Sequence, residues 1–110
     1  MPDKIRILSP NVTDENEYLQ VAARLGELSA LMMYGGRDSM SEREWKEASV
    51  YLTARRVYDE FYQFARRHNR AMYMTLEEIK SELPSYADLD DGIKYLLDKG
   101  LIKEEFREVP

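Results

Sequence analysis

Residues 75–102 read TLEEIKSELPSYADLDDGIKYLLDKGLI, and they carry the strongest structural signals in the chain. The opening letters TLEE form a capping box, in which the Thr and second Glu side chains each accept a backbone hydrogen bond at a helix start. This pattern predicts a short helix over 75–83, which Pro84 ends. A second helix is predicted over about 86–99, and Gly100 supplies a left-handed turn at its end. The stretch therefore predicts two short helices separated by a tight turn.

Three short segments outside these helices have the composition of strands. Residues 101–109 read as an extended strand that directly follows the second short helix. Residues 4–8 and 71–74 are two further strand candidates. We expect a small sheet that joins the two ends of the chain to the segment before the first short helix.

Two longer helical patterns precede this region. Apolar residues recur every three or four positions over about 14–34, and a second pattern without Gly or Pro runs over about 42–69. The second half of helix 42–69 is apolar around much of its circumference, which indicates burial on more than one side. Either helix 14–34 supplies this cover or a second copy of the chain does. We expect a homodimer through helices 14–34 and 42–69, with residues 1–54 as a strand and helical extension that dimerises.

The order of short helix, tight turn, second helix and the letters KGLI entering a strand resembles the winged helix-turn-helix superfamily. The resemblance covers about residues 55–109, so the second half of helix 42–69 stands as the first helix of the motif. It implies a mainly helical fold with a small β-sheet, in which a winged-helix-like unit over 55–110 follows an N-terminal helical extension. Residues 101–109 contain no Gly, Pro or Asn turn, so we expect a conventional wing hairpin to be absent or truncated. The apolar residues expected to hold the two short helices together are Ile79, Leu83, Leu89, Ile93 and Leu96.

The composition limits the classes of protein to which the chain can belong. Its 110 residues fit one domain, and 44% hydrophobic residues suffice for a modest core. The absence of Cys excludes disulfides, Cys-ligated zinc and thiol nucleophiles. No apolar run approaches the roughly 20 residues that span a bilayer, and the short apolar run near the N-terminus does not fit a signal peptide. We therefore expect a single-domain, soluble, cytoplasmic protein without a membrane contact.

The net charge of −5 conceals one basic segment between two acidic ones. Residues 1–54 carry six basic and nine acidic groups, residues 55–73 carry five Arg and two acidic groups, and residues 74–110 carry five basic and ten acidic groups. The five arginines lie on or just after the long second helix and could track the phosphates of double-stranded DNA. A competing interpretation is that they pair with Asp59 and Glu60 and offset the negative end of the helix dipole. These candidate nucleic-acid-binding residues, called the arginine ridge below, are Arg55, Arg56, Arg66, Arg67 and Arg70.

Helix 86–99 occupies the position of the DNA-reading helix in the resemblance, yet the positions that we expect to be exposed are mostly acidic. Carboxylates there would face phosphates and acceptor-rich groove edges, so insertion into a major groove is disfavoured. The same carboxylates favour the positive end of the helix dipole and can simply face water. An alternative role is to dock a basic protein partner. The candidate partner-binding residues are Asp88, Asp90, Asp91 and Lys94.

The sequence lacks the residues that common catalytic, phosphate-binding and metal-binding sites require. His68 is the single His, so neither a Ser-His-Asp site nor a His-ligated zinc site is expected within one chain. No Gly-rich phosphate loop occurs. The letters DLDDG over 88–92 suggest a calcium loop, but Lys99 stands where the bidentate Glu belongs. We therefore expect no catalytic residue, no cofactor and no metal, and hence a protein that is not an enzyme.

Two functions remain open. The first is a non-enzymatic, DNA-associated regulator of transcription, which contacts phosphates through the arginine ridge rather than through the acidic helix. The second is a protein–protein interaction adaptor or assembly module that uses the winged-helix fold without binding DNA. The resemblance favours the first function and the charge pattern favours the second. We take the first as the working hypothesis.

Overall fold

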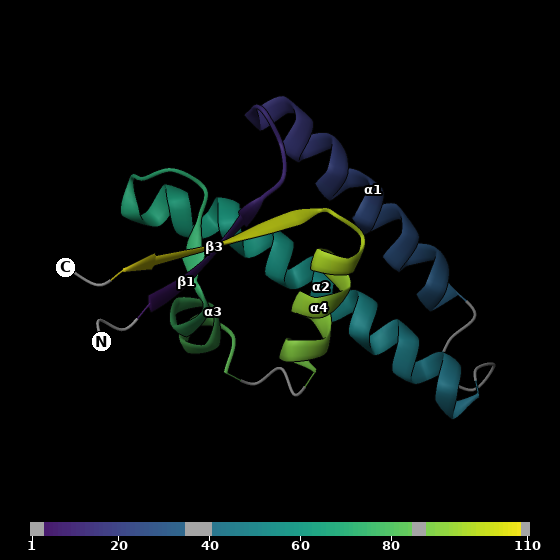
Figure 1. Ribbon diagram of the computed structural model, residues 1–110. Coiled ribbons are helices and arrows are strands. Elements are labelled where there is room, and N and C mark those ends of the chain that lie inside the picture. The colour runs from purple at the N-terminus through teal and green to yellow at the C-terminus, as the bar shows by residue number, and fades with distance from the viewer. Residues whose placement is uncertain (1–3, 35–40, 85–87, 109–110) are drawn as a thin grey trace.

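The computed structural model describes residues 4–34, 41–84 and 88–108. The protein is mainly helical with a small antiparallel sheet, as the sequence predicts (Figure 1). None of the described helices is long and apolar enough to cross a membrane. The elements in chain order are β1 (Lys4–Pro10), α1 (Glu15–Tyr34), α2 (Glu42–His68), β2 (Met74–Thr75), α3 (Leu76–Glu82), α4 (Leu89–Asp98) and β3 (Ile102–Glu108).

The sheet has the strand order β2-β1-β3, and both pairings are antiparallel. The central strand β1 pairs with β3 from Lys4↔Glu108 to Pro10↔Ile102 and with β2 at Leu8↔Met74. Strand β1 therefore lies between β3 and the segment before α3, so the predicted small sheet is confirmed, although its third strand is Met74–Thr75 rather than 71–74. Its buried anchors are Leu8, Met74 and Ile102, which join the main core.

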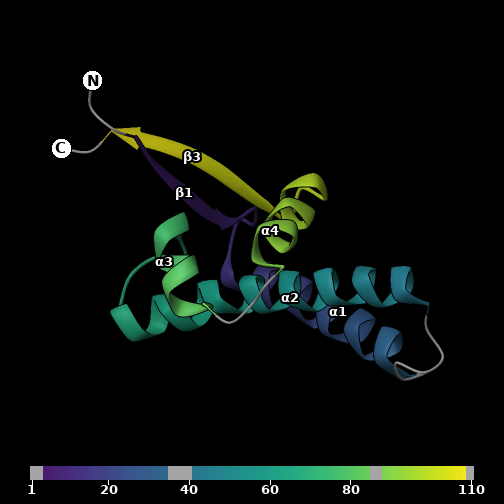
Figure 2. The same cartoon turned by 90° about the horizontal axis from the view of Figure 1, so that it is seen from below.

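Helix α2 is the central support of the fold. It begins with a capping box, in which Ser41 accepts a hydrogen bond from the backbone N–H of Glu44 and the Glu44 carboxylate accepts one from the backbone N–H of Ser41. Figure 2 shows α1 on one side of α2, and α4 and the sheet on the other. One chain thus covers the aromatic half of α2, so burial of this helix does not require a second copy. The buried residues of that half include Val57, Tyr58, Phe61 and Phe64.

Tyr18 fixes α1 against α2. Its ring stacks on Tyr58 with the ring centroids 4.7 Å apart, and its hydroxyl donates a 2.6 Å hydrogen bond to the Tyr58 carbonyl. Burial raises the pKa of both phenols, that of Tyr58 to about 12. Both tyrosines therefore stay neutral at physiological pH and serve as core residues.

The two short helices follow the predicted pattern. Thr75 and Glu78 form the capping box of α3, and Gly100 has a left-handed φ of 70° after α4. The backbone N–H of Leu101 returns to the carbonyl of Leu96, which closes the end of α4. Helix α4 begins at Leu89, later than predicted, and residues 86 and 87 of the predicted helix lie outside the described residues.

The pair β1 and β3 forms a two-stranded ribbon that extends beyond the helices (Figure 2). Ile102 at its base is buried, whereas residues 103–108 are all exposed. Among the described residues, β3 is one continuous strand from Ile102 to Glu108 that pairs with β1 over its whole length. The ribbon is therefore a partly solvated projection held to the body at one end.

Candidate functional site

The arginine ridge occupies the second half of α2 and the residue just after its end. Helix α2 continues to His68, and Asn69 ends it in the left-handed conformation with φ 50° and ψ 53°. Arg66 and Arg67 lie in the last turn, where positive charge offsets the partial negative charge of the helix end. This dipole-matched placement was predicted from the sequence.

Arg55 and Arg56 each pair with a carboxylate one turn later, as the competing interpretation predicts. Arg55 lies 3.8 Å from Asp59, and Arg56 lies 3.0 Å from Glu60. The Arg55 guanidinium also covers Gly26 of α1, since a Cβ built there would lie 3.7 Å from it. Burial raises the pKa of Asp59 despite the two arginines nearby. Both arginines therefore already contact their own chain.

Glu60 is the centre of the ridge. Its side chain is 2% exposed, yet it pairs with Arg56 and accepts a hydrogen bond from Arg67. Arg67 also donates a 3.1 Å hydrogen bond to Glu82 at the end of α3. The hydrogen bond to Glu60 raises the pKa of Arg67. Because an unpaired buried carboxylate is costly, Arg56 and Arg67 both stabilise Glu60. Arg67 also ties α2 to α3 through Glu82.

Arg70 is built into the loop between α2 and β2. Its guanidinium lies 4.5 Å from the ring centroid of Phe64 and 4.1 Å from that of Tyr73. It donates a 3.0 Å hydrogen bond to the Tyr73 carbonyl and a 2.8 Å hydrogen bond to Glu78. Burial alone would raise the pKa of Glu78, but hydrogen bonds from Arg70 and from the backbone of Thr75 outweigh it and lower that pKa. Arg70 therefore holds the start of α3.

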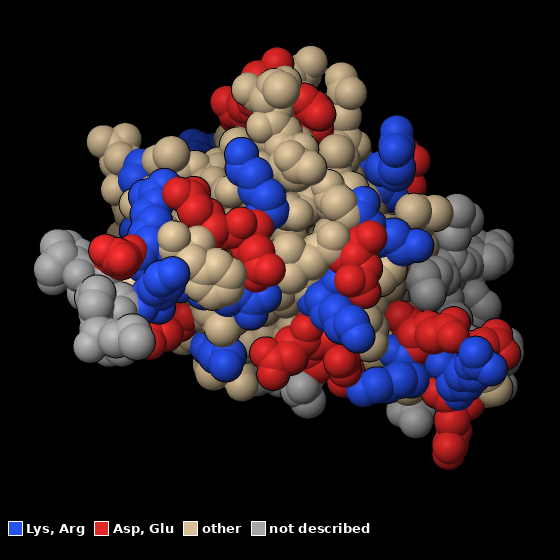
Figure 3. Space-filling model, in the orientation of Figure 1, with Lys and Arg blue, Asp and Glu red and all other residues tan. Residues whose placement is uncertain are grey.

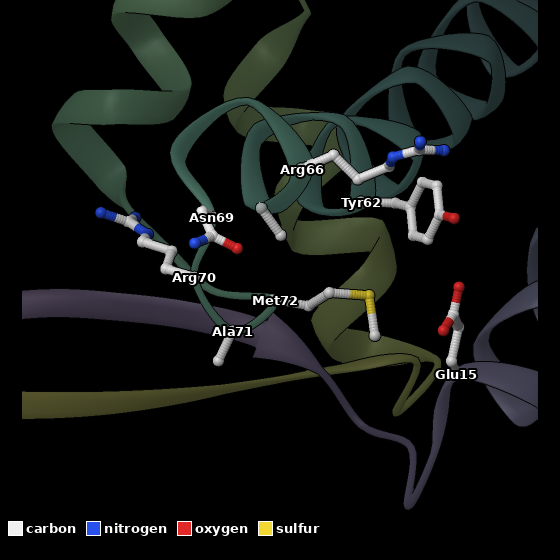
Figure 4. Close-up of a pocket in the computed structure, with 8 residues that line it drawn as sticks. Glu15, Tyr62, Arg66, Asn69, Arg70, Ala71 and Met72 are labelled. Atoms are coloured by element: carbon white, nitrogen blue, oxygen red, sulfur yellow. The ribbon is translucent and has the colours of Figure 1, made fainter.

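Arg66 is the one member of the ridge without an ion pair to another described residue. Its guanidinium lies 5.6 Å from the centroid of the Tyr62 ring. Both side chains line an open cavity of about 490 Å³, shown in Figure 4. In that view the carboxylate of Glu15 lies on the wall facing Tyr62, and the guanidinium of Arg70 points away from the cavity. The charged residues that line the cavity are thus Glu15, Arg66 and Arg70, and the guanidinium that has no ion pair to another described residue is that of Arg66.

The acidic residues of α4 separate into two groups. Asp88 precedes the helix, and its side chain is only 18% exposed. It lies against α2, where it accepts hydrogen bonds from Lys46 and, at 2.7 Å, from Ser49. The expectation that Asp88 faces solvent is wrong, since this end of α4 lies against α2. Those hydrogen bonds hold the pKa of Asp88 below its usual range. The residues that are exposed as predicted are Asp90, Asp91 and Lys94.

Charges of both signs are interspersed over the face that carries β3, α3 and α4 (Figure 3). On the ribbon, Arg6 lies 2.6 Å from Glu104 and Arg107 lies 3.1 Å from Glu105. No group of three or more His, Asp or Glu side chains within residues 4–34, 41–84 and 88–108 could hold a metal ion. This face therefore offers alternating charge rather than a single-sign field.

The long-range partners of the ridge and of Asp88 are not predicted by the sequence pattern. These are Glu78 and Glu82 for the ridge, and Lys46 and Ser49 for Asp88. A signal was present, because the basic segment 55–73 is followed by a strongly acidic one. Opposite charges on adjacent segments of a small domain can meet, but the sequence does not specify which pairs form.

No family model matches the chain, and no curated protein and no solved structure is similar to it at a significant level. The features of the chain that bear on its function are therefore the ridge, α4 and the ribbon. The observation with the clearest chemical consequence is that the ridge is largely neutralised by its own chain.

Proposed function

We propose that this protein is a non-enzymatic protein-interaction module that uses a winged-helix-like unit without reading DNA. One observation carries the proposal: four of the five ridge arginines are paired with carboxylates of α2 and α3. Phosphate binding through the whole ridge would require those pairs to open, and it would strand the buried charge of Glu60. A protein partner can instead use a surface of mixed charge.

The arrangement of elements supports a winged-helix-like unit. The second half of α2, then α3, the turn, α4 and β3 follow one another in the order that the resemblance implies. In this proposal β1 takes the place of the second strand of a wing, because it pairs with β3 over its full length. The strand comes from the N-terminal end of the chain rather than from a hairpin.

The surface of α4 supports the interaction role over DNA reading. Asp90 and Asp91 lie in its first turn and are exposed, where the major-groove floor and phosphates would meet them. Lys94 is the basic residue one turn later. An acidic first turn with one lysine suits a basic or mixed protein surface better than it suits a polyanion.

A titration of fluorescently labelled duplex DNA tests the proposal. At about 50 mM salt we expect no saturable rise in anisotropy up to roughly 100 µM protein, a range in which even non-specific DNA binders respond. Saturable binding that Arg66→Ala/Arg67→Ala abolishes would overturn the proposal. The matched control is Arg43→Ala, at a 90% exposed arginine of α2 outside the ridge, which should change nothing.

A gain-of-binding variant tests the observation that carries the proposal. Glu78→Gln/Glu82→Gln removes the carboxylates that pair with Arg70 and Arg67 from outside α2, while Glu60 remains. If internal pairing is what occupies these arginines, this variant should bind duplex DNA more tightly than the wild type does. Equal binding by both proteins, with an unchanged circular dichroism spectrum, would show that the pairing has no such effect.

The second candidate is the DNA-associated regulator, and Arg66 favours it. This residue is exposed and has no ion pair to another described residue. It lies on the same helix end as Arg67, so a phosphate could approach there first. Binding of the wild type that depends on Arg66 and Arg67 is the result that would favour this function.

A further inference from the structure

Strand β3 forms one edge of the sheet. In the order β2-β1-β3 this strand has a partner on one side, and none of the described elements lies beyond its other side in Figure 2. It runs for seven residues, of which the last six are exposed. An edge of this length presents unpaired N–H and C=O groups that can accept another strand.

Phe106 lies in the middle of this exposed edge. It is 57% exposed, the highest value among the large hydrophobic residues that the structure describes. Its cross-strand neighbour on β1 is Arg6, whose guanidinium is already paired with Glu104. Arg6 and Glu104 leave the Phe106 ring largely exposed, and this ring is a large apolar group in contact with water.

We propose that a second copy of this chain adds to β3 in antiparallel orientation, with Phe106 opposite Phe106 of the second copy. A two-fold axis perpendicular to the sheet then keeps the same faces together. In this register Glu105 lies opposite Arg107 of the second copy, and Arg107 lies opposite its Glu105. The pairing therefore joins the exposed aromatic residue and two opposite-charge pairs in one self-complementary segment.

The neighbouring registers that obey the same symmetry separate the two Phe106 rings. Centring the axis on Glu105 puts this carboxylate opposite its own copy. Centring it on Glu104 does the same for Glu104, although it also places Lys103 opposite Glu105 twice. In the proposed register each Glu104 lies opposite Glu108 of the other copy, and Arg6 partners each Glu104 at 2.6 Å. Aromatic pairing, rather than the balance of charges, therefore selects Phe106 as the centre.

This interface differs from the one that the sequence predicts, a homodimer through helices 14–34 and 42–69. It does not depend on whether the protein binds another protein or DNA. The chain contains no Cys, so single-Cys variants report the register directly. Directly opposite residues of an antiparallel pair have Cα atoms about 4.5–5.5 Å apart, which lies within the roughly 4.4–6.8 Å that a disulfide spans. Phe106→Cys should therefore form a disulfide-linked dimer under mild oxidation.

Two controls make the crosslinking decisive. Glu104→Cys lies on the same face, but its own copy would be about 13 Å away along the strand, so it should remain monomeric on a non-reducing gel. Leu28→Cys, at an exposed position of α1, reports on dimerisation through the helices. Crosslinking at Leu28 in place of Phe106, or equal crosslinking at Glu104 and Phe106, would overturn the proposal.

A charge-swap cycle tests the same interface with the aromatic residue intact. Glu105→Arg alone and Arg107→Glu alone each place like charges across the axis twice, so each should raise the dimer dissociation constant about tenfold in sedimentation equilibrium. The double variant Glu105→Arg/Arg107→Glu should restore the wild-type value. A wild type that stays monomeric at millimolar concentration, or single variants that dimerise normally, would contradict the proposal.

Discussion

The Glu60 carboxylate is buried between two arginines of its own helix. Arg56 lies one turn before it and Arg67 lies two turns after it. Replacing it by Gln leaves both arginines without their shared charge and a buried amide without equivalent acceptors. We expect Glu60→Gln to lower the free energy of unfolding by about 1–3 kcal/mol. Urea denaturation followed by circular dichroism measures the change.

The matched control for that variant is Glu47→Gln. Glu47 also pairs with an arginine of α2, but both side chains are largely exposed. A surface pair of this kind contributes about 0–1 kcal/mol, so its loss should be small. Equal effects of Glu47→Gln and Glu60→Gln would contradict the structural importance of the buried carboxylate.

Gly92 is required by the close approach of α4 to α2. A Cβ built at this position would lie 3.0 Å from the backbone nitrogen of Ala54 and 3.0 Å from Cγ2 of Thr53. The Ala54 backbone is inside a long helix and cannot yield locally, so Gly92→Ala should destabilise the protein by about 1–2 kcal/mol despite the better helix propensity of Ala.

For Gly26 we expect the opposite change in the free energy of unfolding, and urea denaturation measures both glycine substitutions. A Cβ there would meet the movable Arg55 side chain at 3.7 Å or more, so Gly26→Ala should stabilise α1 by up to about 1 kcal/mol. Stabilisation by both substitutions would mean that α4 does not pack as tightly on α2 as the structure has it.

At the scale of the elements, Asp88 fastens the start of α4 to α2. Hydrogen bonds from Lys46 and Ser49 lower its pKa in the folded protein below that of an ordinary Asp. Its contribution to stability is therefore fully present above the ordinary Asp pKa, near 4, and is lost as pH falls through the lowered value. Asp88→Asn should flatten this acid limb of the stability curve.

Urea midpoints measured between about pH 2 and 7 check that expectation. Asp90→Asn is the control, because Asp90 is an exposed acidic residue of the same helix for which no partner is expected. An acid limb that is equally steep in Asp88→Asn and in the wild type would show that the contact with Lys46 and Ser49 does not fasten α4.

The elements whose signals are local were predictable from the sequence. The capping box at Thr75 and the glycine turn at Gly100 involve neighbouring residues, and both appear where expected. The direction of Asp88 was not predictable in this way, because it depends on Lys46, which lies 42 positions earlier in the chain. The helical periodicity of residues 86–99 alone predicts that Asp88 is exposed to solvent.

In the arginine ridge, the ion pairs within α2 are predictable from the sequence, whereas the ion pairs to α3 are not. The pairs Arg55–Asp59 and Arg56–Glu60 follow from a spacing of four residues on a helix, and they were foreseen. The pairs of Arg67 with Glu82 and of Arg70 with Glu78 depend on how α3 packs beside the end of α2. The apolar circumference of α2 leaves open whether helix 14–34 or a second copy covers it, and in the structure α1, α4 and the sheet cover its aromatic half.

Across the whole molecule, the arginines of the basic segment pair with Asp59 and Glu60 inside that segment and with Glu78 and Glu82 of the acidic segment that follows it. The surface that results has both signs mixed over β3, α3 and α4 (Figure 3). Such a surface gives little long-range attraction for a polyanion, whereas it allows specific pairing with another protein surface. The central claim is therefore that the arginines are engaged within the fold.

The salt dependence of binding to duplex DNA tests this claim most directly, because its slope counts the phosphates that are contacted. Measured from about 10 mM salt upward, where weak binding can be followed, the logarithm of the association constant should fall against the logarithm of salt with a slope between 0 and about −1, as expected if Arg66 alone is available. A slope of about −4 to −5 would mean that all five arginines bind phosphates, and it would contradict the account.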